Sequence, residues 1–150
     1  MGENVFKFPN VYKKIQDDGH AIGNHTYNHL NGWRTETDVY LENVEKAQHL
    51  IKGKLFRPPY GKFTKQQQRI ISSPRFALNS IMWTVLSADF DSNISGQQCL
   101  KNMVTQAEDG SIIVMHDSER AWKNLEYALP RALDFFSEKG FSFEAITGIG

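Results

Sequence analysis

The chain has 150 residues, of which 40% are hydrophobic and 23% charged, and its formal net charge is zero. This length and composition predict one globular domain with a buried core. The balanced charge argues against a nucleic-acid partner. No apolar run approaches the roughly 18 residues of a membrane span, and the first residues lack the apolar core of a signal peptide. Localisation is left open.

Short apolar runs alternate with helical stretches, which is typical of βα units and a parallel sheet. The expected helices cover residues 9–18, 35–52, 64–72, 95–107 and 124–139. The expected strands cover residues 20–22, 55–56, 80–85, 111–115 and 141–146. We expect the second helix to begin with a capping box at Thr35 and to bury Val39, Val44, Ala47 and Ile51. The single cysteine, Cys99, excludes an internal disulfide and fits a helix face.

Three of the five histidines fall within residues 19–29. His25 and His29 are four residues apart, so in a helical turn they share one face, with Cβ atoms about 5–6 Å apart. Two imidazoles at that separation can bind one metal ion at about 2.0–2.1 Å each. Thr26 could fix the loop through a hydrogen bond. Such a pair alone is weak evidence, because most are surface accidents.

Candidate polar residues repeatedly follow the expected strands. They are His25, His29, Arg57, Asp89 and His116. Because the carboxyl ends of parallel strands meet at one edge, we expect a site there. Two alternatives remain open: Asp91 rivals Asp89 as the loop acid, and His116 could be a core histidine. Asp117 and Ser118, which follow His116, favour a polar mouth.

Four motifs occur in a fixed order. They are His25-Thr26-x-x-His29, Arg57-Pro58-Pro59-Tyr60, a strand with Trp83 that ends at Asp89, and Val114-Met115-His116. Together they resemble the polysaccharide deacetylases with a NodB homology domain, over nearly the whole chain. The resemblance implies an α/β fold, a distorted (β/α) barrel, that removes acetyl groups from N-acetylated carbohydrate. It also implies a divalent metal, usually Zn²⁺, held by one Asp and two His.

The resemblance gives roles to individual residues. His25 and His29 become the two histidine ligands of the metal. Tyr60 gives a backbone N–H to the developing oxyanion, and Arg57 orients the catalytic base. Amide hydrolysis needs an activated water and a stabilised oxyanion, which a metal and N–H donors supply.

The resemblance also implies which residues act on the leaving amine and which bind the acetyl group. His116 protonates the amine, and Asp89 orients and charge-stabilises His116, as acid catalysis requires. Phe90 and Val114, where the family usually has Trp and Leu, line the pocket for the acetyl methyl. Trp83 is a further substrate contact. Trp33 fits either the core or a sugar-stacking rim.

One family motif has no match. The family opens with a strand ending in Asp-Asp-Gly, whose acids are the base and the third metal ligand. Asp17-Asp18-Gly19 is not a substitute, because it follows a helix. Residues 1–4 resemble the end of the family's second strand, so residues 1–150 are expected to form an N-terminally truncated domain without the first strand and helix.

Two expectations follow from this difference. The chain is one metal ligand short and has no positioned base, so its activity is doubtful. The alternative is a non-catalytic metal- or glycan-binding relative, or a gene fragment. A barrel with an exposed edge also favours self-association.

Overall fold

The computed structural model describes residues 1–146. The chain divides into two compact units, residues 1–82 with 145–146 and residues 83–144. Each unit has its own parallel sheet and its own hydrophobic core. In the described part of the chain, no helix is long and apolar enough to cross a membrane.

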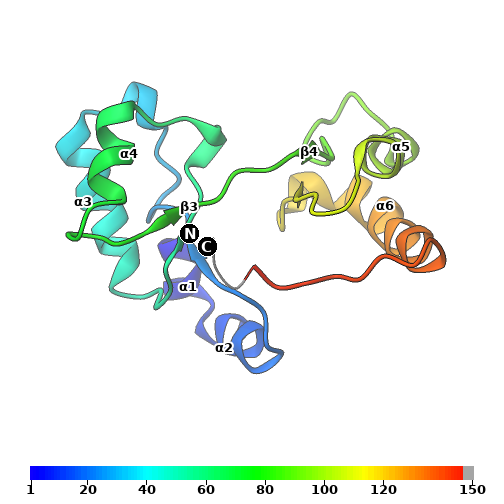
Figure 1. The fold of residues 1–150 in the computed structure, drawn as a ribbon, viewed down its shortest axis with the longest axis horizontal. Coiled ribbons are helices and arrows are strands. Elements are labelled where there is room, and N and C mark those ends of the chain that lie inside the picture. The colour runs from blue at the N-terminus through cyan, green and yellow to red at the C-terminus, as the bar shows by residue number, and fades with distance from the viewer. Residues whose placement is uncertain (147–150) are drawn as a thin grey trace. The chain divides into compact units, whose positions relative to one another are not determined.

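The first unit is built on a three-stranded parallel sheet with the order β1-β2-β3. Its strands are β1 (Gly23–Asn24), β2 (Leu55–Phe56) and β3 (Asn79–Ser80) (Figure 1). Its helices are α1 (Gly2–Lys7), α2 (Pro9–Asp17), α3 (Thr37–Gln48) and α4 (Lys65–Ile71), with 3₁₀ turns η1 (Gly32–Arg34) and η2 (Pro59–Gly61). The core joins α3, β2 and α4 through Tyr40, Leu41, Val44, Phe56, Ile71 and Leu78.

The second unit pairs β4 (Val85–Leu86) with β5 (Ile113–Val114) in parallel. Two helices pack together beside these strands, α5 (Gly96–Gln106) and α6 (Glu119–Glu138) (Figure 1). Their core contains Cys99, Met103, Ala128, Ala132 and Phe136. Cys99 therefore lies on a buried helix face, as the sequence predicts, and burial raises the pKa of its thiol to about 11.

Several helix boundaries are confirmed, because local capping chemistry sets them. Thr64 caps α4 in a complete capping box with Gln67. Ser95 caps α5 by accepting a hydrogen bond from the Gln98 N–H. Pro9 begins α2, where its missing N–H has no cost.

Two expectations, about the first residues of the chain and about the cap of α3, are wrong. Residues 2–4 lie in α1 and form no strand end, because the N–H groups of Gly2 and Glu3 bond to the carbonyls of Thr26 and Tyr27 at 3.0 and 2.9 Å. Thr35 does not cap α3, because its hydroxyl donates to the Asn31 carbonyl at 2.8 Å.

The expected extent and phase of α3 are also corrected. It ends at Gln48, short of residue 52. It turns Val39 outward, with the side chain 51% exposed, and buries Tyr40 and Leu41 instead. Val44, Ala47 and Ile51 are buried as predicted.

Three strand expectations are corrected. The strand expected at residues 20–22 lies at Gly23–Asn24. Residues 80–85 do not form one strand: β3 ends at Ser80 and β4 begins at Val85. Residues 141–146 form no strand, and the rings of Phe141 and Phe143 pack on Phe136 instead. The last helix starts earlier than expected, at Glu119, because Ser118 caps it.

Candidate functional site

The loop between His25 and His29 follows β1 and is held by the side-chain amides of two asparagines. The Asn24 side chain accepts a hydrogen bond from the Thr26 N–H at 2.8 Å and donates to α3, to the Val44 carbonyl at 2.9 Å. Asn43 accepts from the Tyr27 N–H at 2.8 Å. The Thr26 hydroxyl, by contrast, is buried without a hydrogen-bond partner among the described residues. The loop is therefore fixed by Asn24 and Asn43, and the role expected of the Thr26 hydroxyl is wrong.

The two histidine rings lie together in this loop. Their centroids are 4.9 Å apart, although the loop is a turn and not a helix. His25 Nδ1 lies 2.6 Å from the Arg57 carbonyl oxygen. A carbonyl can only accept, so Nδ1 carries the proton and Nε2 keeps its lone pair. Burial lowers the pKa of His25 to about 4, so the ring is neutral at pH 7.

These features fit one half of a metal site. A neutral imidazole with one nitrogen fixed on a backbone carbonyl and the other unprotonated is the usual form of a histidine ligand. His29 supplies a second ring beside it. Within residues 1–146, no group of three or more His, Cys, Asp or Glu side chains could hold a metal ion. The described chain thus offers two nitrogen donors.

Arg57 and Tyr60 follow β2 at the same carboxyl edge of the sheet. The Arg57 guanidinium donates to the carbonyls of Ile81 and Met82 at 3.1 and 3.2 Å, just beyond β3. These bonds occupy backbone groups that a longer strand would use, which explains the early end of β3. The Tyr60 ring packs edge-on against His29, with centroids 4.6 Å apart.

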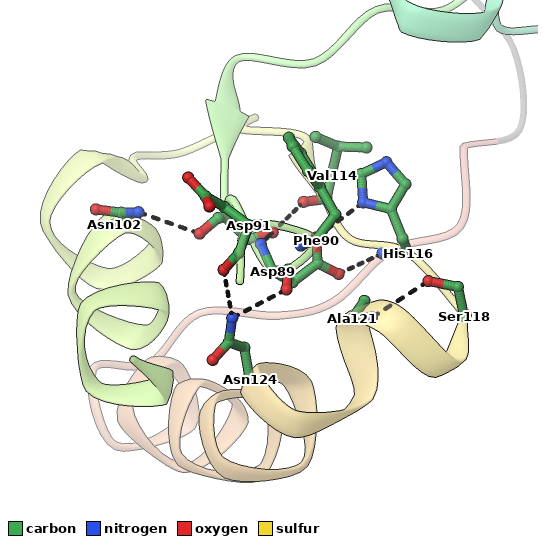
Figure 2. A network of polar contacts seen from close by, with 10 residues as sticks. Asp89, Phe90, Asp91, Asn102, Val114, His116, Ser118, Ala121 and Asn124 are labelled. Atoms are coloured by element: carbon green, nitrogen blue, oxygen red, sulfur yellow. Dashed lines mark hydrogen bonds and ion pairs between the residues drawn. The ribbon is translucent and has the colours of Figure 1, made fainter. Parts of the chain in front are cut away.

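In the second unit, a buried carboxylate and an imidazole form a pair at the carboxyl ends of β4 and β5 (Figure 2). Asp89 is 0% exposed, and its Oδ1 lies 2.8 Å from His116 Nδ1. Its second oxygen accepts from the His116 backbone N–H. Burial alone would raise the pKa of Asp89, but the hydrogen bonds from His116 outweigh it and lower the pKa. Asp91 instead bonds to Asn93 in an exposed turn.

The expected acetyl-pocket residues are partly assembled around this pair. The Phe90 ring meets the His116 ring edge-on, with centroids 5.1 Å apart. Val114 is buried in β5, and its carbonyl accepts a hydrogen bond from the Ser87 hydroxyl at 2.7 Å. Trp83 lies between β3 and β4, outside both strands.

Asn124, which the sequence pattern marks only as the start of the last helix, is a further part of this group. Its buried side-chain amide donates to the carbonyls of Asp89 and Asp91 at 3.1 and 3.0 Å and closes the loop that carries Asp89 (Figure 2). A buried polar residue on an apolar helix face was the available signal, because such a group must find partners.

Backbone strain concentrates at these groups. Thr26, His29, Tyr60 and Ala88 all have φ near +60°, a region that costs a residue with a side chain about 1–3 kcal/mol. Strain of this kind clusters at functional sites. It therefore supports the two groups as the functional part of each unit.

Known proteins share the sequence and the fold of this chain. The family model for polysaccharide deacetylase matches residues 1–76. A peptidoglycan-N-acetylglucosamine deacetylase of Bacillus cereus is 32% identical over an alignment of 124 residues that covers 79% of this chain and 44% of that protein. The chain thus spans less than half the length of this relative.

Solved structures show the same fold. A peptidoglycan N-acetylglucosamine deacetylase bound to a naphthalenyl hydroxamate-type benzamide superposes with a TM-score of 0.87 at 29% identity, over 97% of this chain and 70% of that chain. A CE4 family pseudoenzyme from Bacillus anthracis gives 0.84 at 26% identity, over 97% of this chain and 52% of that chain. The expected α/β fold class of the family is confirmed. The chain belongs to the polysaccharide deacetylase family, a group of divalent-metal-dependent hydrolases of N-acetylated carbohydrate.

Proposed function

We propose that this chain serves in the metal-dependent removal of acetyl groups from N-acetylated carbohydrate. The observation that carries the proposal is the Asp89–His116 pair, in which a fully buried carboxylate holds one imidazole nitrogen at 2.8 Å. Family membership and the adjacent rings of His25 and His29 support the same reaction.

His116 is the residue that would protonate the leaving amine. Asp89 fixes Nδ1, so Nε2 is the nitrogen that can deliver a proton, and the side chain is 40% exposed to do so. As the C–N bond breaks, this proton passes to the amide nitrogen. The hydroxyl of a water molecule joins the acetyl carbon, and the remaining proton of that water passes to a general base outside the set of residues assigned here. Acetate and a free sugar amine result. The buried carboxylate stabilises the charged imidazolium before the transfer.

The metal ligands and the candidate oxyanion donor come from the first unit. His25 and His29 would hold a divalent ion such as Zn²⁺, and the third ligand is outside the set found here. When bound, the ion lowers the pKa of a bound water and polarises the acetyl carbonyl. The Tyr60 backbone N–H is our candidate oxyanion donor, and Arg57 our candidate for orienting the base. Phe90, Val114 and Trp83 stay our candidates for the acetyl pocket.

A non-catalytic role is the second candidate. It is favoured by the absence of a three-ligand acidic, cysteine or histidine group within the described residues. One solved relative of this fold is itself a pseudoenzyme. In this alternative the chain binds a metal ion or a glycan without releasing acetate.

An acetate-release assay separates the two candidates. The full chain is incubated with chitotetraose, with Zn²⁺ or with a chelator, beside His116→Ala and the exposed-histidine control His49→Ala. The proposal predicts Zn²⁺-dependent acetate release that falls about 10²–10⁴-fold in His116→Ala and is unchanged in His49→Ala. Release that persists in His116→Ala, or no release at all, contradicts it.

Self-association stays a separate prediction. Strand β1 lies at one edge of its sheet in the order β1-β2-β3, and an unpaired edge can add a strand from another chain. Light scattering coupled to gel filtration would show a dimer or larger species. A single monomer mass at all concentrations contradicts the prediction.

A further inference from the structure

Trp33 is exposed and yet firmly held. Its side chain is 65% exposed, and isolated exposed apolar residues are ordinary. What distinguishes Trp33 is that hydrogen bonds hold both its indole ring and its backbone. Its indole N–H donates to the Phe63 carbonyl at 3.1 Å, and its backbone N–H donates to Asn31 Oδ1 at 3.0 Å. An indole that remains in water gains little from such fixation for folding alone.

The turn that carries Trp33 is itself docked tightly. The Gly32 N–H donates to the Lys62 carbonyl at 3.1 Å, and the fully buried Gln67 donates to the Gly32 carbonyl at 3.0 Å. A Cβ atom at Gly32 would lie 2.6 Å from Gln67 Oε1 and 2.7 Å from the Lys62 carbonyl. The segments can approach this closely only with glycine. The indole is therefore presented in one position.

This turn lies beside the histidine pair. It follows the His25–His29 loop, and its docking partner, residues 62–63, follows Tyr60. The contact between the His29 and Tyr60 rings, 4.6 Å between centroids, joins the same two segments. Trp33 lies four positions after His29, so their Cα atoms are at most about 13–14 Å apart. Trp33 thus belongs to the carboxyl edge of the sheet that carries the candidate metal ligands.

We propose that Trp33 is a stacking platform for a pyranose ring of the glycan, one sugar or more away from the acetyl group that is removed. The C–H face of a β-linked sugar packs on a flat indole, and an indole held in advance loses little entropy on binding. The Lys62 ammonium lies over the indole ring, 5.1 Å from its centroid, so the sugar would pack on the opposite face of the indole. The inference rests on the proposed function for its substrate class.

The direct test uses the indole N–H signals of the ¹⁵N-labelled full chain, which has three tryptophans. Chitotetraose is added in steps, and single Trp variants assign the signals. We expect the Trp33 signal to shift on binding. Trp33→Ala should weaken binding about tenfold, which equals ~1.4 kcal/mol, and Trp33→Phe should restore part of it. Trp122→Ala, at a site 58% exposed, is the matched control and should bind like the parent chain.

Each outcome decides the inference. An unmoved Trp33 signal, unchanged affinity in Trp33→Ala, an equal loss in Trp122→Ala, or no binding of chitotetraose overturns it. The test does not depend on catalysis. Binding through Trp33 without acetate release supports the platform and contradicts the proposed function. Acetate release with the same KM in Trp33→Ala supports the function and overturns the platform.

Discussion

Replacing Asp89 with Asn removes a buried charge while keeping the shape of the side chain. The carboxylate accepts hydrogen bonds from the backbone N–H of His116, from His116 Nδ1 at 2.8 Å and from the Phe90 N–H at 3.0 Å. An amide has only one acceptor oxygen, so its NH₂ group faces one of these donors. A buried donor without a partner costs about 1–3 kcal/mol, and hydrogen bonds to a charged group are worth about 1.5–3 kcal/mol.

We therefore expect Asp89→Asn to lower the free energy of unfolding by about 2–3 kcal/mol at pH 7, which corresponds to about 4–12 °C in Tm for a chain of this size. Because the folded-state pKa of Asp89 lies below the ordinary value of 3.8, its stabilisation is complete above that pH. It is lost as pH falls through the folded-state pKa. The difference in the free energy of unfolding between the parent chain and Asp89→Asn should therefore become smaller below pH 4.

Urea unfolding from pH 7 down to pH 2.5 measures this difference. The control is Asp91→Asn, because Asp91 bonds within an exposed turn and should change stability by no more than about 0.5 kcal/mol. A gap between the parent chain and Asp89→Asn that is the same at pH 7 and pH 2.5 would refute the reasoning. An equal loss in Asp91→Asn would do so as well.

Two further predictions concern the supports of the two groups. Asn124→Ala leaves one buried and one partly buried carbonyl without their donor and should cost about 1–3 kcal/mol in urea unfolding; a neutral result would show that the loop does not depend on this amide. Gly32→Ala forces a Cβ to 2.7 Å from the Lys62 carbonyl and should cost about 2–3 kcal/mol. Gly110→Ala, at φ +77° with no atom within 4 Å of the added Cβ, should cost only about 1 kcal/mol of left-handed strain, and equal losses would contradict the packing argument.

The sequence predicts the part of the fold that local chemistry determines. The helix that begins at Pro9 and the helices that Thr64 and Ser95 cap are predicted correctly, because capping residues act within three or four positions. The sequence also predicts polar residues at the ends of parallel strands, and His25 and Arg57 do follow β1 and β2.

The predictions from sequence are wrong where contacts with residues distant in the chain determine the local structure. The first residues are helical because the loop at Thr26 and Tyr27 supplies carbonyls to their N–H groups, a contact that no local pattern reveals. The strand with Trp83 is interrupted where Arg57 takes the carbonyls of Ile81 and Met82. The left-handed residues and the amide supports of the site arise in the same way, from tertiary structure that overrides residue preferences.

A zinc titration tests the central claim, that His25 and His29 form the metal-binding half of a deacetylase site. The chelator-stripped full chain is titrated with Zn²⁺ by calorimetry, beside His25→Ala and the exposed-histidine control His49→Ala. We expect one stoichiometric site in the parent chain and in His49→Ala, and its loss in His25→Ala. A chain that binds no zinc, or a site that His25→Ala leaves unchanged, would contradict it.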